Sequence, residues 1–119
     1  MKNVDLLKDN GVNIDGSLET LRTMETYDMI LKIFVKTLAE NKEKLTSYKE
    51  NKDMQNYSIL VHAIKSESKS LGFDHLSELA LNHELESKAN NMSFVLDNFD
   101  ELLKEIERVS AVSNEYLGM

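Results

Sequence analysis

The residue best suited to chemistry in this sequence is His62, which lies in a stretch ending at Gly72 that predicts one helix closed by a glycine. At roughly 100° per residue, the side of that helix opposite His62 is apolar and carries Tyr57, Leu60, Ile64 and Leu71. The imidazole should therefore point to solvent. The side chains predicted to lie within about 60° of it are Ser58, Ile59, Lys65, Ser66 and Lys69. An exposed histidine with lysines one and two turns further on is suited to carrying an anion.

A metal-binding helical bundle is the competing chemical class, because the 3 His and 21 acidic residues offer many ligands. Di-iron bundles use Glu-x-x-His pairs on facing helices. The residues three positions before the histidines are instead Ile59, Gly72 and Ala80, so we expect no metal site. The other histidines have plain explanations: His75 is expected at the surface of a first helical turn, and His83 at the edge of the core.

The elements that position His62 follow from composition and periodicity. The chain of 119 residues has 41% hydrophobic residues, no Pro and only 4 Gly, which favours one domain of long helices joined by short turns. We expect an all-α fold over 1–119, an antiparallel up-down four-helix bundle with a short additional N-terminal helix.

Helix-breaking and helix-capping residues predict where each helix of the bundle begins and ends. Residues 1–16 are polar and turn-prone and predict a loosely packed lead-in. Ser17 can cap the short helix, and the first long helix should run from about Thr26 to a polar connection at 47–52. Asp53 should cap the second helix, which carries His62, and Asp74 the third, with the last helix at about 93–116.

The charge balance limits the partners. A net charge of −7 and a pI near 4.9 disfavour nucleic acid and anionic lipid surfaces. No apolar run approaches the roughly 20 residues of a membrane-spanning helix, and the N-terminus is no signal peptide. The absence of Cys is compatible with a reducing compartment. We therefore expect a cytoplasmic protein.

The residues around His62 resemble the central motif of the histidine-containing phosphotransfer domain of bacterial multistep phosphorelays. That motif has the form His-x-x-Lys-Gly-Ser-Ser/Ala, with an apolar residue and a Gly nine and ten positions after the His. The matching residues here are His62, Lys65, Ser68, Leu71 and Gly72. The resemblance covers nearly the whole chain in one register: it includes an entry segment at 11–19, an apolar helix at 27–34, and Leu76, Leu79, Ala80 and Glu84 downstream. This sequence departs from the family at Ser66 and Glu67, where Gly and then Ser or Ala are usual, and at His83, where Leu is favoured.

The resemblance implies that His62 accepts a phosphoryl group from the aspartyl phosphate of a receiver domain and passes it to another receiver. A neutral imidazole suits this role, since the ordinary histidine pKa of about 6.5 leaves most rings unprotonated at neutral pH. Lys65 is expected to attract phosphate oxygens, with Lys69 in a secondary role, and Ile59, Ser58 and Ser66 are expected to form the docking patch.

The partners implied are receiver domains and a hybrid sensor histidine kinase. The chain is expected to act as a monomeric carrier without kinase activity, with no cofactor of its own, because the receiver should bring Mg²⁺. The departures at Ser66 and Glu67 leave an alternative open: the same bundle could act as a docking scaffold whose His62 is never phosphorylated.

Overall fold

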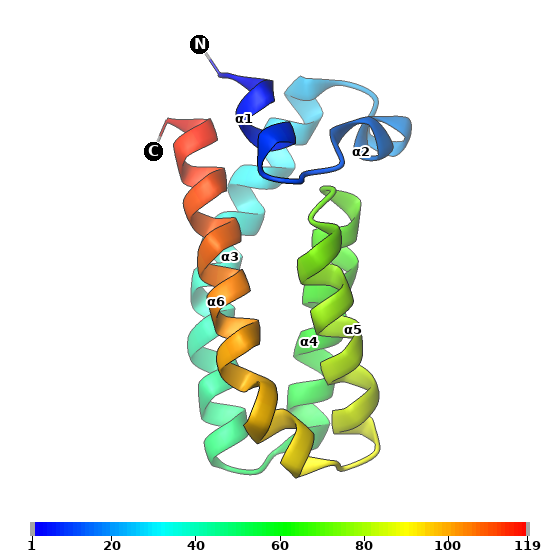
Figure 1. Ribbon diagram of the computed structural model, residues 1–119, viewed down its shortest axis with the longest axis vertical. Helices are drawn as coiled ribbons and strands as arrows, with labels where there is room; N and C mark the ends of the chain where they lie inside the picture. Colours follow the sequence, from blue (N-terminus) through cyan, green and yellow to red (C-terminus); the bar gives the residue numbers. More distant parts are fainter. Residues whose placement is uncertain (1, 119) are drawn as a thin grey trace.

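The computed structural model describes residues 2–118, and this part of the chain contains six α-helices and no strand (Figure 1). The helices are α1 (Val4–Asp9), α2 (Ile14–Leu21), α3 (Met24–Glu50), α4 (Met54–Ser70), α5 (Asp74–Lys88) and α6 (Met92–Leu117). The four long helices alternate in direction and form an antiparallel up-down bundle, which confirms the predicted all-α fold. Within residues 2–118, no helix is both long enough and apolar enough to cross a membrane.

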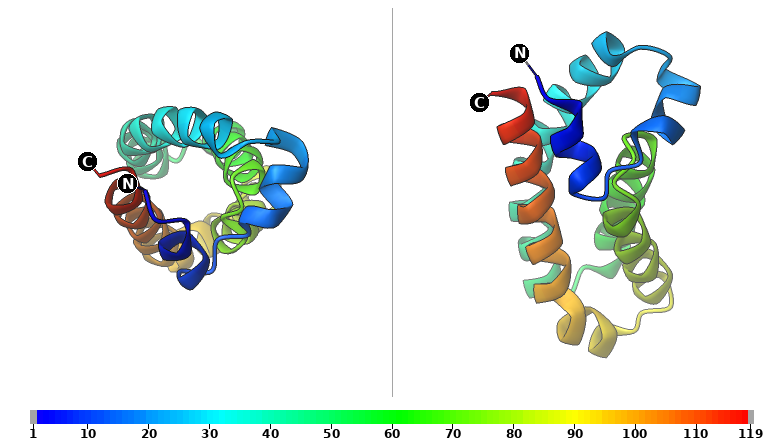
Figure 2. Two further views of the ribbon diagram at one scale, coloured as in Figure 1. Left: turned by 90° about the horizontal axis from the view of Figure 1, so that it is seen from above. Right: turned by 45° about the horizontal axis from the view of Figure 1, so that its top comes forward.

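Around the bundle each long helix packs against two neighbours. Helix α4 contacts α3 and α5, and α6 contacts α5 and α3. The view along the bundle axis shows this ring, with the N-terminal helices lying across one end (Figure 2). Helix α4 therefore buries one side against two neighbours and leaves a strip free on its outer side.

The N-terminal segment is more closely packed than the sequence suggested. The prediction of a loosely packed lead-in at 1–16 is wrong, since α1 forms there and Leu7, Val12 and Ile14 are buried. Helix α1 packs on α6, and α2 packs on α3 and α4, so these apolar side chains close the end of the core. Ser17 is not the cap of α2 but a buried residue inside it, and the cap is Asn13, whose side chain accepts from the Gly16 amide at 3.0 Å.

The helix boundaries follow the capping residues. Asp53 caps α4 as predicted, accepting from the Asn56 amide at 3.2 Å. The connection predicted at 47–52 is shorter in the structure, because α3 continues to Glu50 and only the next three residues link it to α4. Asp74 is the first residue of α5 rather than its cap; Phe73 takes the cap position.

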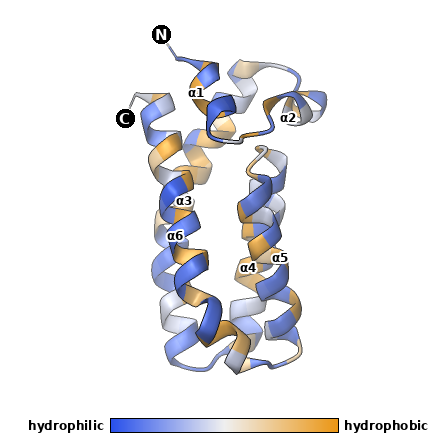
Figure 3. Cartoon of the chain, in the orientation of Figure 1, coloured by the Kyte–Doolittle hydropathy of each residue, from blue (hydrophilic) through white to orange (hydrophobic). Residues whose placement is uncertain are grey.

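A single hydrophobic core fills the bundle, and apolar residues recur as stripes along its helices (Figure 3). Fully buried members include Tyr27, Leu31 and Leu38 of α3, Tyr57, Val61 and Ile64 of α4, and Leu102 and Val109 of α6. Their spacing is that of amphipathic helices. Burial of one side of α4 against this core fixes the direction in which its opposite side faces.

The turn after α4 is tied to two other elements. Gly72 has a φ of +85°, and its carbonyl accepts from the Asn13 amide at 2.9 Å. A Cβ at this position would lie 2.5 Å from the Asn13 carbonyl oxygen, so only glycine fits without displacement. The buried Tyr27 hydroxyl donates to the Leu71 carbonyl at 2.7 Å. The end of α4 is thus held by both α2 and α3.

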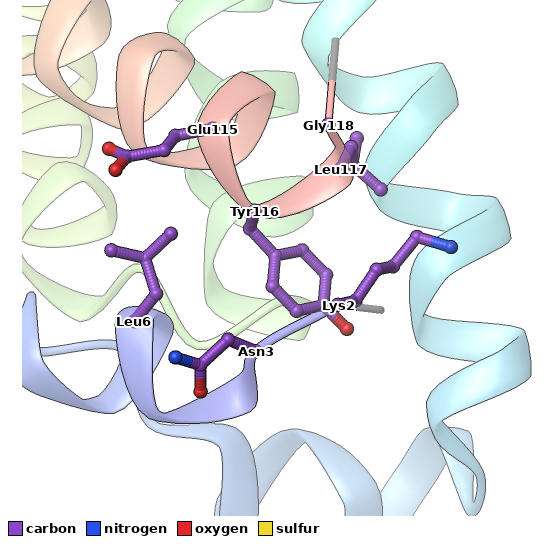
Figure 4. A pocket seen from close by; sticks show the side chains of 7 residues that line it. All are labelled: Lys2, Asn3, Leu6, Glu115, Tyr116, Leu117 and Gly118. Carbon is purple, nitrogen blue, oxygen red and sulfur yellow. The ribbon is translucent and has the colours of Figure 1, made fainter.

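A cleft of about 500 Å³ lies where α1 meets the end of α6 (Figure 4). Its lining residues are Lys2, Asn3, Leu6, Glu115, Tyr116, Leu117 and Gly118. The Tyr116 hydroxyl donates to Asp28 Oδ1 at 2.6 Å and joins α6 to α3. Since none of the residues around His62 lines this cleft, it is separate from the site described next.

Candidate functional site

His62 lies near the middle of α4 with its side chain 56% exposed. Tyr57, Val61, Ile64 and Ser68 form the buried face of the helix. Leu60, predicted to lie on that face, is only partly buried and packs at its margin. The predicted outward orientation of the imidazole is confirmed.

One carboxylate holds the imidazole from the neighbouring helix. Glu84 of α5 is 4% exposed, and its Oε2 lies 2.7 Å from His62 Nδ1. Lys65 Nζ donates to Glu84 Oε1 at 2.7 Å, and Lys88 Nζ donates to Oε2 at 2.8 Å. The buried carboxylate therefore gathers three partners from two helices.

Glu84 is ionised. Hydrogen bonds from Lys65 and Lys88, with a smaller contribution from His62, lower the pKa of Glu84 to about 2 although burial alone would raise it. An ionised carboxylate can only accept hydrogen bonds, so the contact at 2.7 Å requires a proton on His62 Nδ1. In the neutral ring the lone pair is then on Nε2, the nitrogen that does not contact Glu84.

The two predicted lysines differ in their surroundings. Lys65 is 26% exposed and bound to Glu84, so its ammonium lies beside the imidazole. Lys69 is 68% exposed and pairs at 3.5 Å with Asp74, which places it in a more open setting. The structure brings Lys65 into the cluster around Glu84 and leaves Lys69 outside it.

The three residues predicted to form the docking patch differ in their exposure to solvent. Ile59 is 62% exposed and Ser66 is exposed, as expected for a contact surface. The placement of Ser58 on the exposed face is wrong: it is 6% exposed, and its hydroxyl donates to the Gln55 carbonyl at 2.8 Å. Ser58 is therefore not available to a partner at this surface.

Further apolar surface lies on α3, where Met29 and Ile33 are 63% and 67% exposed. Next to it, a mainly apolar cleft of about 250 Å³ lies between α2, α3 and α4. Ile33 and Glu67 both line this cleft, so Glu67 lies between α4 and α3 rather than free in solvent. Partial burial raises the pKa of Glu67.

The other two histidines lie apart from this cluster. His75 is exposed, as predicted, at the start of α5. His83 is 1% exposed and fully inside the core rather than at its edge, with Nδ1 2.9 Å from the Tyr57 hydroxyl. Across residues 2–118, no group of three or more His, Asp or Glu side chains is arranged to hold a metal ion.

Sequence reasoning missed two members of the site, Glu84 and Lys88. Glu84 was recognised as a residue that matches the family pattern, but no role was assigned to it. Nothing in its local sequence indicates that it is buried against His62, 22 residues away. Lys88 could have been found as the (i, i+4) partner of Glu84 once Glu84 was suspected.

Comparison with known proteins agrees with this geometry. The family model described as Hpt domain matches residues 29–112, which include α4, α5 and all four residues of the cluster. No curated protein and no solved structure matches the chain. Hpt domains are phosphocarrier modules of phosphorelays, in which they interact with receiver domains and kinases. With an exposed histidine held by a buried carboxylate and a family match over most of its length, this chain belongs to the Hpt domain family.

Proposed function

We propose that the protein accepts a phosphoryl group on His62 Nε2 from the aspartyl phosphate of a receiver domain and passes it to the aspartate of another receiver. The observation that carries this proposal is the 2.7 Å contact between His62 Nδ1 and the buried Glu84 carboxylate. It keeps the proton on Nδ1 and the nucleophilic lone pair on the exposed side of the ring.

In the first transfer, the Nε2 lone pair forms a bond to phosphorus while the bond between phosphorus and the donor aspartate oxygen breaks. The aspartate leaves as a carboxylate, and the ring gains positive charge as it loses the lone pair. Glu84 lies where it can stabilise that charge through the Nδ1 proton, a preorganised electrostatic contribution. The second transfer reverses these bond changes on another receiver.

Phosphoryl transfer needs mainly positioning and charge stabilisation. On this chain, Lys65 provides a cation bound to the same carboxylate as His62, while Lys69 lies a turn further on and contributes from a more open position. The Mg²⁺ that neutralises the phosphoryl oxygens is expected to come with the receiver's acidic pocket. The chain supplies the nucleophile and a docking face, with no kinase activity of its own.

The docking face extends from Ile59 past His62 and Ser66 toward the apolar cleft at Ile33. Exposed isoleucines in such positions gain from burial under a partner. Ser66 adds a small side chain one turn after His62, where a partner's active site must come close. We propose a monomer that binds one receiver at a time, in the cytoplasm, within a pathway that begins at a hybrid sensor kinase.

The test is transfer of labelled phosphate from a phosphorylated receiver domain encoded in the same genome. We expect acid-labile, base-stable label on the native protein, none on His62→Gln, and normal labelling of His75→Gln, which removes an exposed histidine outside the cluster. Labelling of His62→Gln would refute the assignment. Receiver binding without any labelling of the native protein would instead support a docking scaffold whose histidine is not phosphorylated.

A further inference from the structure

Glu67 is the one charged residue among those that line the cleft between α2, α3 and α4. Within α4 it follows His62 by five residues, which is about 7.5 Å along the helix axis. A carboxylate therefore lies in a mainly apolar depression close to the proposed phosphoacceptor. The other side chains around this cleft are those of Leu21, Ile30, Ile33, Phe34, Ser70 and Leu71.

The Glu67 carboxylate has no positively charged partner in the part of the chain that the structure describes. The nearest lysines along α4 are Lys65, which pairs with Glu84 at 2.7 Å, and Lys69, which pairs with Asp74 at 3.5 Å. No other salt bridge in this part of the chain involves Glu67. The side chain is half-buried, and this burial raises the pKa of its carboxyl group. Glu67 has thus lost part of its water without gaining a cation.

Two other glutamates show how this fold treats a carboxylate that loses its water. Glu84 is bound by two lysines, and Glu105 is bound by Arg108 through contacts of 2.7 and 2.8 Å. Pairing of this kind is needed because an unpaired buried charge costs free energy. Any partner that covered Glu67 with apolar surface alone would leave it in that unpaired state.

A partner that docks on α3 and α4 also covers Glu67, because the apolar side chains it would bury lie beside that residue. Ile33 and Ile30 are 67% and 36% exposed, and both line the same cleft. Their burial favours docking, but the same contact removes the remaining water from the carboxylate. The partner must therefore bring a positively charged hydrogen-bond donor to the mouth of the cleft.

We propose that Glu67 determines which receiver domains bind, by selecting those that place an arginine or lysine beside the apolar side chain that covers the cleft. The inference rests on the proposed function, in which a receiver docks on this face, and adds the chemistry of the receiver's surface. An arginine suits the site best, since its guanidinium is weakly hydrated and can donate two hydrogen bonds to one carboxylate. Receivers with only apolar or acidic groups at this position are rejected, so repulsion contributes to specificity as well as attraction.

The experiment measures binding of an unphosphorylated receiver domain by calorimetry, with a receiver from the same genome that binds the native protein. The native protein is compared with Glu67→Gln, Glu67→Lys and Glu101→Gln. Glu101→Gln removes an exposed carboxylate from α6, on the opposite side of the four-helix ring from α4, and matches the charge change of Glu67→Gln. Because Glu67 is only half-buried, its replacement should leave the fold intact, which thermal unfolding verifies.

Glu67→Gln keeps the size of the side chain but removes its charge, so we expect the Kd for the receiver to rise about tenfold. Glu67→Lys places two positive charges together and should raise the Kd about a hundredfold. Glu101→Gln should bind as the native protein does. Unchanged or tighter binding by Glu67→Gln, or an equal loss in Glu101→Gln, overturns the inference.

A double-mutant cycle identifies the cation on the receiver. Each arginine and lysine of the receiver surface is replaced in turn by methionine, and each variant is tested against the native protein and Glu67→Gln. We expect one position whose replacement weakens binding to the native protein about tenfold and leaves binding to Glu67→Gln unchanged. A glutamate at that receiver position should restore binding to Glu67→Lys to within about threefold of the native pair. Absence of any coupled position overturns the inference.

Labelling of His62 is followed in the same variants, so that the two proposals fail separately. At receiver concentrations above the Kd, Glu67→Gln should still be labelled, because the hydrogen bonds of Glu84 go to His62, Lys65 and Lys88 and not to Glu67. Receiver binding without label refutes the phosphoacceptor role, while the comparison of the Glu67 variants still decides this inference. Label on His62 with binding that does not depend on Glu67 overturns this inference alone. Absence of both binding and label with every receiver of the genome refutes the proposed function and this inference with it.

Discussion

A histidine on a helix surface becomes a defined nucleophile only when one ring nitrogen is assigned its proton. In this protein Glu84 makes that assignment from α5, and its ionisation is secured by two lysines. Burial of the carboxylate matters because a fully hydrated carboxylate would be mobile and screened. The 4% exposure of Glu84 keeps the acceptor oxygen in place beside an imidazole that is itself accessible.

Replacing Glu84 by Gln tests this assignment. The amide oxygen can still accept from Nδ1, but it carries no charge to stabilise the ring as the bond to phosphorus forms, and Lys65 and Lys88 lose their anionic partner. We expect the initial rate of phosphoryl transfer from a phosphorylated receiver to fall by about tenfold or more. The rate is measured from label on the protein over time.

Glu78→Gln is the matched control, because it removes an exposed carboxylate from the same helix. It should transfer at the native rate. A native rate in Glu84→Gln, with the fold verified by thermal unfolding, would remove Glu84 from the chemistry and leave it as a structural ion-pair partner.

For individual residues, the sequence predicted the nucleophile His62 but not Glu84, the carboxylate that orients it. His62 and Lys65 lie three residues apart in one helix, so helical periodicity alone brings them together. The approach of Glu84 depends on the register between α4 and α5, which packing of the whole core decides. Ser58 illustrates the same limit, since helical periodicity placed it on the exposed side near His62 and the assembled bundle buries it.

Among the elements, the surface shared by α3 and α4 combines the acceptor with apolar side chains. Ile59→Glu and Ile33→Glu should each weaken binding of a receiver by about tenfold or more, since each puts a charge into an interface that buries an exposed isoleucine. Binding is measured by calorimetry with an unphosphorylated receiver. Phosphorylation by phosphoramidate, a small phosphoryl donor that needs no docking surface, should remain at the native rate, because the side-chain hydrogen bonds of Glu84 go to His62, Lys65 and Lys88 and to neither isoleucine.

Leu96→Glu supplies the control for those two substitutions. Leu96 is 55% exposed, similar to Ile59, but lies on α6, away from the α3 and α4 surface. Equal loss of receiver binding in Leu96→Glu and in the isoleucine variants would show that net charge rather than the proposed face controls docking.

The turn that ends α4 gives a second prediction about the helices, which concerns the contribution of Gly72 to stability. Gly72 and Gly11 both have positive φ, +85° and +80°, but a Cβ at Gly72 would meet the Asn13 carbonyl while one at Gly11 would meet nothing within 4 Å. Gly11→Ala should therefore suffer only the backbone cost of about 1 kcal/mol, and Gly72→Ala should lose at least about 1 kcal/mol more in free energy of unfolding. Urea unfolding of both variants measures the difference. Equal losses would show that the contact between this turn and α2 adds nothing to stability.

The sequence predicted the four long helices well because their apolar stripes are long and regular. It failed for residues 4–14, where α1 is only six residues long and its burial depends on Leu7 and Ile14 reaching the open end of a bundle built from later residues. Such short elements carry too few periodic positions for a local pattern to be visible, and their packing is a property of the assembled molecule.

For the molecule as a whole, the buried pair of His83 and Tyr57 links stability to pH. Burial lowers the pKa of His83 to about 4, against a weaker opposing hydrogen bond to the Asn98 backbone, from the ordinary value of 6.5. Between these two values the unfolded chain binds a proton that the folded protein does not. The stability present above pH 6.5 is therefore lost progressively as the pH falls toward 4.

We expect this single histidine to reduce the free energy of unfolding by about 2 kcal/mol between pH 7.5 and pH 5. Urea unfolding at both pH values, in the native protein and in a Tyr57→Phe/His83→Leu double variant, isolates its contribution. The double variant removes both polar groups of the pair, so that neither is left buried without a partner. It should lose about 2 kcal/mol less than the native protein over this interval, while its Glu84 and Glu67 titrate as before. An identical pH dependence in the two proteins would mean that His83 is protonated inside the fold at a cost that the core accommodates, and the buried ring would then have no part in acid sensitivity.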